Sequence, residues 1–264
     1  MTSFSVSRKD CVLNEGAYHF YQENGYVILE DFLTNDEVED VLGAVKRLAQ
    51  YESETSKAHD YTANAQRVWN LLNKDLIFHE LLLSPQIDLW MNKIFHRNTK
   101  HRKYFLSSFQ ANILHSQAQA QILHVDTPVP EPIPPYTIKA NTIWALNDFT
   151  QTNGATEIIP KTHRNSTRPS REPTQSDIQK LIKVIVPKGS VLITDGNLWH
   201  RSGTNQSEQS RYALLGSFAA SYMREIACED DSARFLTPKM KSQMRPELYD
   251  MIGGNHGIKP GNDY

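Results

Sequence analysis

The spacing of hydrophobic positions predicts a helical first part of the chain. In "DFLTNDEVEDVLGAVKRLAQY" (31–51), apolar residues recur with the 3.6-residue period of an amphipathic helix. Thr34 and Glu37 form a capping-box pattern, which predicts that the helix begins directly after Thr34. Its predicted buried face carries Val38, Val41, Leu42, Val45, Leu48 and Ala49.

The same patterns predict further elements on either side of this helix. The run "GYVILEDF" (25–32) is rich in β-forming residues and predicts a short strand. Residues 68–95 predict one or two more helices, with Pro85 at a break because proline lacks the backbone donor that a helix interior needs.

After about residue 103 the hydrophobic pattern changes to short β-rich runs separated by Pro, Gly, Asn and Ser. Many strands at short spacing favour a sandwich or barrel, and 264 residues is an ordinary length for one large domain of that kind. The last forty residues return to a partly helical pattern. The predicted strands are 104–114, 119–126, 137–149, 155–160, 182–196 and 211–222.

Composition excludes several classes of partner. With 28 Lys and Arg against 30 Asp and Glu, the net charge of −2 gives no global argument for nucleic acid or an anionic membrane. The chain has no apolar run long enough for a membrane helix, and we expect no secretory signal because the first residues lack an apolar segment. Its two cysteines, Cys11 and Cys228, show no metal spacing, so we expect reduced thiols in a cytoplasmic protein.

The stretch "QILHVD" (121–126) carries the first chemical signal. Side chains two residues apart on a strand share a face, so His124 and Asp126 would project together. Such a pair alone is common and is more often a hydrogen-bonded or surface pair than a metal site. His200, which we place at the end of the apolar strand in "GSVLITDGNLWH", adds a third ligand. Two histidines and a carboxylate form the facial triad of non-haem Fe(II) oxygenases, although zinc enzymes also use this set.

Arg211 follows His200 by eleven residues and opens the apolar run "RYALLGSF". An arginine in such a strand is costly unless its guanidinium meets an anion, and its fork matches a carboxylate. 2-Oxoglutarate bound to iron would present its far carboxylate at such a place. An exposed edge-strand arginine is the simpler interpretation of Arg211 alone, but the combination with the three ligands favours the co-substrate site.

With these motifs, the sequence resembles the phytanoyl-CoA dioxygenase family of Fe(II)/2-oxoglutarate oxygenases. The segments that carry the resemblance are "YQENGYVILEDFLTNDEV", "QILHVDTP", "ALNDFTQTNGATEIIPKTHR" and "KGSVLITDGNLWHRSGTNQSEQSRYAL". The resemblance implies a mainly β fold: a double-stranded β-helix (jelly-roll) core with N-terminal helices packed on its major sheet. We therefore expect one domain over 1–264, with a helical part (about 1–100), a jelly-roll core (about 101–222) and a C-terminal extension (223–264).

The resemblance also implies roles for single residues. Iron ligands are expected at His124, Asp126 and His200, and a salt bridge to 2-oxoglutarate at Arg211. The family implies co-substrate contacts at Gln121 and Thr156. For Gln121, a polar strand residue that is hydrogen-bonded within the protein is an equally good interpretation. For Thr156, a β-forming residue without a role in the site is equally good. The histidine of "IPKTHR", His163, is expected to be structural or at most an outer partner of the site.

Prolines at 128, 130, 132, 134 and 135 directly follow the ligand pair. Because proline fixes φ and lacks a donor, they predict a stiff extended loop. We expect this loop to wall the site and to present Ile133 or Tyr136 to the substrate. Trp144 and Met223 are further candidates for the pocket by neighbourhood alone.

The expected function is oxidation of a small natural product in secondary metabolism with Fe(II), 2-oxoglutarate and O₂. The aspartate at 126 argues against halogenation, for which related enzymes have a small residue, and leaves hydroxylation, desaturation and ring formation open. An acyl-CoA hydroxylase, a protein side-chain oxygenase, a zinc hydrolase and a catalytically inactive jelly-roll binding module remain alternatives. The expected partner is the small-molecule substrate, with no nucleic acid and no membrane, and a homodimer is one option for the assembly.

Overall fold

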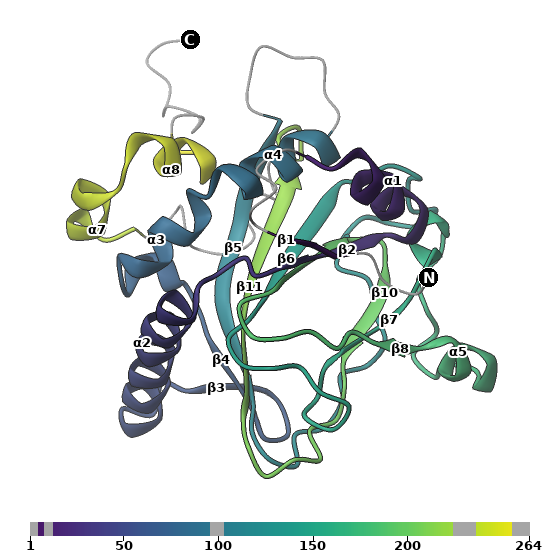
Figure 1. Cartoon of the computed structure of the whole chain (residues 1–264), viewed down its shortest axis with the longest axis horizontal. Helices are drawn as coiled ribbons and strands as arrows, with labels where there is room; N and C mark the ends of the chain where they lie inside the picture. Colours follow the sequence, from purple (N-terminus) through teal and green to yellow (C-terminus); the bar gives the residue numbers. More distant parts are fainter. Residues whose placement is uncertain (1–4, 8–12, 96–102, 224–235, 255–264) are drawn as a thin grey trace.

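Two β-sheets face each other at the centre of the molecule (Figure 1). The computed structural model describes residues 5–7, 13–95, 103–223 and 236–254. The large sheet has eight strands in the order β1-β2-β9-β6-β11-β5-β4-β3, and the small sheet has three in the order β10-β7-β8. The strands are β1 (Ser5–Ser7), β2 (Tyr26–Glu30), β3 (His59–Thr62), β4 (Ala65–Val68), β5 (Tyr104–Leu114), β6 (Lys139–Ala145), β7 (Thr156–Ile159), β8 (Ile182–Lys183), β9 (Val191–Asp195), β10 (Trp199–Ser202) and β11 (Arg211–Ala220).

Most of the helices flank the large sheet on the side away from the small sheet (Figure 1). The capping box at the start of α2 is confirmed, because Thr34 Oγ1 accepts from Glu37 N and Glu37 Oε2 accepts from Thr34 N. The break at Pro85 is also confirmed, since Pro85 is the first residue of α4. The helices are α1 (Glu15–Asn24), α2 (Asn35–Glu54), η1 (Leu71–Asn73), α3 (Ile77–Leu82), α4 (Pro85–Ile94), η2 (Thr162–Arg164), α5 (Gln175–Lys180), α7 (Pro238–Gln243) and α8 (Pro246–Met251).

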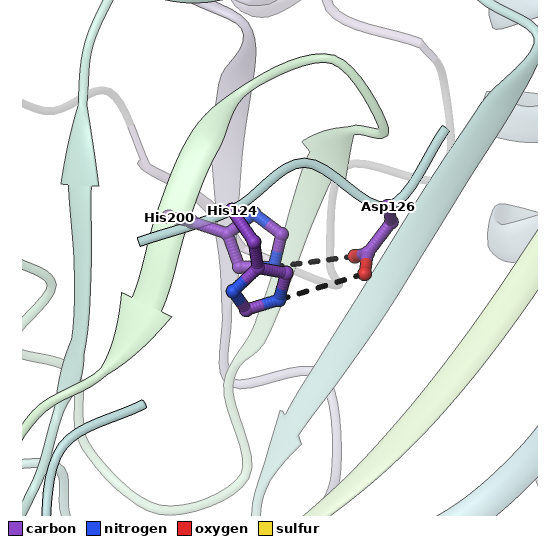
Figure 2. Close-up of side chains that lie close together, drawn as sticks. All are labelled: His124, Asp126 and His200. Atoms are coloured by element: carbon purple, nitrogen blue, oxygen red, sulfur yellow. Dashed lines mark ion pairs between the residues drawn. The ribbon is translucent and has the colours of Figure 1, made fainter. Parts of the chain in front are cut away.

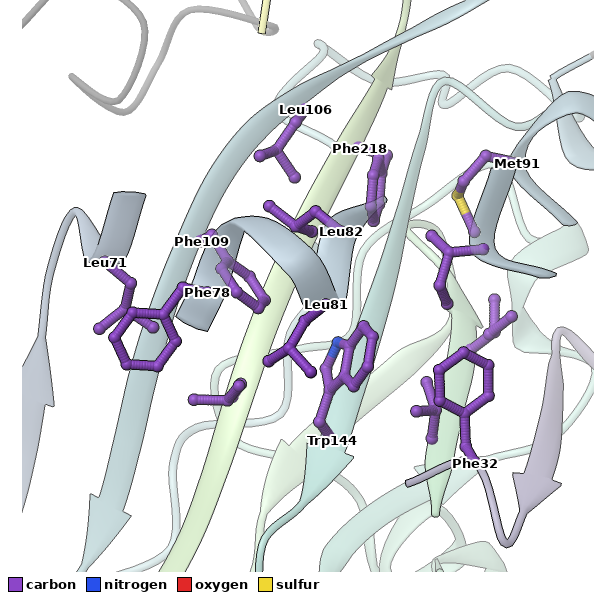
Figure 3. Packing of buried hydrophobic residues seen from close by; sticks show 14 of the residues in the cluster. Phe32, Leu71, Phe78, Leu81, Leu82, Met91, Leu106, Phe109, Trp144 and Phe218 are labelled. Atoms are coloured by element: carbon purple, nitrogen blue, oxygen red, sulfur yellow. The ribbon is translucent and has the colours of Figure 1, made fainter. Parts of the chain in front are cut away.

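The main hydrophobic core lies between these helices and the outer face of the large sheet (Figure 3). Trp144 of β6 is fully buried there and meets Phe32 edge-on, with ring centroids 5.2 Å apart. Phe109 of β5 packs in the same way against Phe78 of α3. The expected packing of N-terminal helices on the major sheet is therefore confirmed.

A second core fills part of the space between the two sheets. Tyr26 of β2, Leu192 of β9 and Ile158 of β7 are buried in it, together with Leu198. This core occupies only part of the gap. The rest of the inner face of the large sheet is mainly polar and forms the floor of the cavity described below.

Three sequence predictions need correction. Residues 119–126 do not form a strand, since only His124 makes a β-bridge, to His200. The predicted strand 182–196 is two strands, β8 and β9, and His200 belongs to a separate strand, β10, rather than to the end of β9. The hairpin formed by β3 and β4 was not predicted. Cys11 and Cys228 lie outside the described residues.

Candidate metal centre and active site

The inner face of the large sheet borders a cavity of about 650 Å³. Its floor comes from alternate positions of β5, β6 and β11, because side chains on one strand alternate between the two faces. The volume of this cavity falls within the range of about 300–1,000 Å³ that is usual for small-molecule sites. The floor residues are Ser108, Gln110, Asn112, Lys139, Asn141, Ile143, Arg211, Ala213, Leu215 and Ser217.

His124, Asp126 and His200 meet at one side of this cavity (Figure 2). Their potential ligand atoms all lie within 4.8 Å of one another. Asp126 Oδ2 is 3.2 Å from His200 Nε2, and Asp126 Oδ1 is 3.7 Å from His124 Nε2. No other group of three or more His, Cys, Asp or Glu residues with this geometry occurs in the described parts of the chain.

Backbone hydrogen bonds bring the remote ligands together. His124 and His200 exchange both N–H···O bonds at 3.0 Å, and Asp126 N donates to Gly196 O at 2.8 Å. The segment around His124 is thus an extended chain that runs beside β10 with only occasional pairing. The predicted same-side placement of His124 and Asp126 is confirmed, although the predicted strand that was to produce it is not there.

Both imidazoles are oriented by a backbone carbonyl. His124 Nδ1 lies 2.7 Å from Ile122 O, and His200 Nδ1 lies 2.9 Å from Leu198 O. A carbonyl can only accept, so each Nδ1 carries the proton in the neutral ring and each Nε2 keeps its lone pair. Both Nε2 atoms face Asp126, and the three side chains present two nitrogens and one carboxylate to a cation.

The charges of the three groups are coupled. Burial lowers the pKa of His124, and the neighbouring His200 adds to this. Burial also acts on His200, but the carboxylate of Asp126 outweighs it and raises the pKa of His200. For Asp126, burial favours the neutral acid, yet the two imidazoles hold the pKa of this carboxyl well below its usual range. Asp126 is therefore an anion at neutral pH and is ready to bind a cation.

Arg211 lines the same cavity and is only 3 % exposed. One Nη donates to Gly154 O at 3.1 Å, and the guanidinium lies 4.7 Å from the centre of the Phe149 ring. Its Nε is buried and has no hydrogen-bond partner among the residues that the structure describes. Burial lowers the pKa of Arg211 from its ordinary value. A buried cation with an unused donor fits an anionic ligand, and a carboxylate matches its fork.

Comparison with known proteins matches this arrangement to one family. The family model of phytanoyl-CoA dioxygenase (PhyH) matches residues 21–213, which include the three clustered side chains and Arg211. The chain belongs to the phytanoyl-CoA dioxygenase family. It is a non-haem dioxygenase that depends on iron and 2-oxoglutarate.

Individual relatives agree with this assignment. Dioxygenase af480 of Aspergillus fumigatus is 28% identical over 261 residues, covering 94% of this chain and 80% of the relative. Dioxygenase FrzG of a Cladobotryum species is 24% identical over 242 residues, covering 83% and 77% of the two chains.

Solved structures share the fold of this dioxygenase. HygX of Streptomyces hygroscopicus, crystallised with nickel and 2-oxoglutarate, superposes with a TM-score of 0.63 at 15% identity, over 80% of this chain and 89% of HygX. The epimerase SnoN from nogalamycin biosynthesis superposes with a TM-score of 0.66 at 16% identity, over 78% and 80%. The expected double-stranded β-helix fold is thereby confirmed.

The two lesser co-substrate positions also reach the cavity of the dioxygenase. Thr156, the first residue of β7, is buried in its wall. Gln121 lines it as well, but its Oε1 accepts from Ser202 N at 3.1 Å. Part of the hydrogen-bonding capacity of this glutamine therefore holds the segment before His124 against β10.

Sequence reasoning missed the contribution of the β3–β4 hairpin. Tyr61 and Arg67, together with Trp69 just after β4, line the cavity. The Arg67 guanidinium lies 4.3 Å from the Tyr61 ring centre and 4.8 Å from that of Trp69, and its Nε donates to Asn112 Oδ1 at 3.1 Å. No recognisable motif marks this polar hairpin. The alternation of "SSFQAN" in β5, in contrast, is a signal from which Ser108, Gln110 and Asn112 could have been predicted.

The proline-rich loop does not wall the cavity, since no residue from 127–138 lines it in the described structure. The loop is held instead against residues 166–168: Ile133 N donates to Ser166 O at 2.7 Å, and Arg168 Nη2 donates to Val129 O at 2.6 Å. Ile133 is buried in that contact, and Tyr136 is 57% exposed.

The other candidates also lie elsewhere in the dioxygenase. Trp144 belongs to the core beneath the helices, and Met223 packs at the edge of hydrophobic clusters. His163 is structural, as expected: its Nε2 lies 3.1 Å from Gln22 O, and its ring fills the space beside Gly25. Gly25 has a φ of +83°, and a side chain there would collide with this ring.

Within the described ranges, no helix is long and apolar enough to cross a membrane.

Proposed function

We propose that His124, Asp126 and His200 hold the iron and that Arg211 binds the distal carboxylate of 2-oxoglutarate. The observation that carries the first assignment is the convergence of two Nε2 atoms and an ionised carboxylate within 4.8 Å. A buried guanidinium in the same cavity, whose Nε has no partner in the described part of the chain, supports the second. Gln121 and Thr156 are the proposed additional contacts of the co-substrate.

Bound iron supplies the oxidising chemistry, with dioxygen and 2-oxoglutarate as its reactants. The protein orients the side chains that hold the iron and keeps the Asp126 carboxylate ionised. Backbone carbonyls fix both imidazoles, and their Nδ1–H bonds leave each Nε2 available. Arg211 fixes one end of the co-substrate through its buried guanidinium.

We propose a free small natural product as the substrate. A cavity of about 650 Å³ suits a small molecule, and the polar floor suits one with several hydrogen-bonding groups. Two proteins that share the fold bind such molecules in their crystals, since HygX was crystallised with hygromycin B and SnoN with nogalamycin RO. Hydroxylation, desaturation and ring formation all remain within this proposal. A homodimer stays a prediction.

The test is turnover of 2-oxoglutarate to succinate across a panel of polar natural products and acyl-CoA thioesters, followed by mass spectrometry. We expect product with a natural product and iron, and none without 2-oxoglutarate. Substitution Asp126→Ala should reduce turnover by more than about a hundredfold, since even outer partners of a metal ligand cost about 10- to 100-fold. Circular dichroism should show an intact fold in this variant. Full turnover by Asp126→Ala, or a zinc-dependent hydrolysis that ignores 2-oxoglutarate, would contradict the proposal.

A further inference from the structure

Asn141 is a buried amide on the cavity side of β6 and is only 2% exposed. It stands between Ser217 of β11 and Thr194 of β9 in the sheet register. An amide at such a place is stable only if its donors and acceptor find partners, because a buried unpaired polar group destabilises the fold. The partners of Asn141 therefore indicate why an amide is placed there.

One partner is the carboxylate of the metal centre. Asn141 Nδ2 donates to Asp126 Oδ2 at 2.6 Å, a short distance typical of a hydrogen bond to an ionised acceptor. The second partner is Ser217, whose hydroxyl donates to Asn141 Oδ1 at 2.9 Å. The three side chains form one series of hydrogen bonds from β11 through β6 to the loop that carries the ligand pair.

This series fixes the direction of the amide. With Oδ1 accepting from Ser217, the NH₂ group must face Asp126. The opposite orientation would place the amide oxygen against an anionic carboxylate and would be repulsive. Ser217 and Asn141 are directly paired residues on adjacent strands, so the sheet itself holds the donor in position.

Asp126 needs such support because its own backbone is not part of a strand. Its N–H donates to Gly196 O, and His124 two residues earlier makes only an isolated bridge. The carboxylate side chain is thus tied to the large sheet through Asn141. A carboxylate held in one orientation loses less conformational freedom when it binds a cation.

We propose that Asn141, itself oriented by Ser217, is a positioning residue that holds the Asp126 carboxylate for iron. This inference rests on the proposed function, since it assumes that Asp126 is a metal ligand. Asn141 acts through Asp126 and not on the substrate. Its removal should therefore weaken metal binding even when no substrate and no 2-oxoglutarate are present.

The experiment measures the dissociation constant of the full chain for Co²⁺, by its visible absorption, in wild type, Asn141→Ala, Ser217→Ala and Asn112→Ala. We expect Asn141→Ala to raise this constant by about 10- to 100-fold, the usual effect of losing an outer partner of a ligand. Ser217→Ala should raise it less, because the amide remains. Asn112→Ala is the matched control: it removes an amide of the same cavity that bonds Arg67 and not Asp126.

A second measurement is the visible charge-transfer band of the anaerobic protein with Fe(II) and 2-oxoglutarate. We expect a shifted or weakened band in Asn141→Ala, because the amide bonds the Asp126 carboxylate. Wild-type affinity for Co²⁺ in Asn141→Ala, or an equal loss in Asn112→Ala, would overturn the positioning role and leave the proposed function intact. If Asn141→Ala does not fold, Ser217→Ala decides: a raised constant supports the role and an unchanged one overturns it. Absence of metal binding in the wild type would overturn the proposed function and this inference with it.

Discussion

Where the eight-stranded sheet borders the cavity, its two faces are built from the same strands and differ in character. In β5, Phe109, Ala111 and Ile113 face the helices and belong to the main core. Their neighbours Ser108 and Asn112 point the other way and line the cavity. In β11, Leu214 and Phe218 belong to the core, whereas Arg211 and Ser217 line the cavity.

The difference shows how one strand serves both stability and chemistry. The helix-side face buries apolar groups against apolar groups, which is the arrangement that stabilises a fold. The cavity face holds polar side chains whose groups are only partly satisfied within the chain, such as Gln110 Oε1 and Arg211 Nε. Unused donors and acceptors of this kind lower stability and favour the binding of a polar ligand.

The comparison is tested most directly by two adjacent residues of β5. Phe109→Ala should lower the free energy of unfolding by about 3–5 kcal/mol, because it leaves a cavity where the ring packs against Phe78 and Trp144. Ser108→Ala, one residue earlier and on the cavity face, should change it by less than about 1 kcal/mol. Chemical denaturation measures both. Equal losses would mean that the two faces contribute alike to stability.

In contrast to Phe109, substitution of Arg211 should have a large effect on ligand binding and a small effect on the free energy of unfolding. Arg211→Ala should weaken the binding of 2-oxoglutarate by about 2–5 kcal/mol, the usual cost of removing one member of a buried charge pair. The apparent KM for 2-oxoglutarate in succinate release reports this change. Arg211→Lys keeps the charge but loses the fork, so we expect an intermediate value. An unchanged KM in Arg211→Ala would remove Arg211 from the co-substrate site.

The elements that sequence predicted well are those whose signals are local. The capping box of Thr34 and the 3.6-residue period after it depend on residues within one helix, and the start of α2 was predicted correctly. The clustering of His124, Asp126 and His200 was predicted from the combination of the His-x-Asp pair, a distant histidine and Arg211, and from the family resemblance that these motifs carry. These signals can be read without knowing which segments become neighbours.

The predictions that failed depend on neighbours far along the chain. Residues 119–126 have the composition of a strand, but their neighbour β10 has four residues and pairs on its other edge with β7. The hairpin of β3 and β4 has a polar sequence without a clear period, and it exists because Ala65 and Val68 pair with β5. The proline-rich loop was predicted to wall the site, but hydrogen bonds hold it against residues 166–168 instead.

The smallest expected effect is a pH dependence of the stability of the metal-free protein, which arises from residues that line the cavity. In the metal-free protein, the pKa of Asp126 is lowered and that of His200 is raised. The lowered pKa contributes stability that is present above the ordinary value of 3.8 and is lost as pH falls through the folded value. The raised pKa contributes stability that is fully present below 6.5 and is lost as pH rises through the folded value. The pair should therefore stabilise the metal-free fold most between these two values.

The test compares Tm of chelator-treated wild type and Asp126→Asn at pH 6 and pH 9. We expect the wild type to exceed the variant by more at pH 6, with a change of a few degrees, because about 1 kcal/mol corresponds to roughly 2–4 °C in a chain of this size. Asp177→Asn is the matched control, since hydrogen bonds from Thr174 are the first cause of the lowered pKa of Asp177. Its effect should be the same at both pH values. A Tm difference between wild type and Asp126→Asn that does not change with pH would show that the imidazoles do not set the charge of this carboxylate. The cavity face would then differ from the helix-side face in polarity, but its ionisable groups would not influence one another.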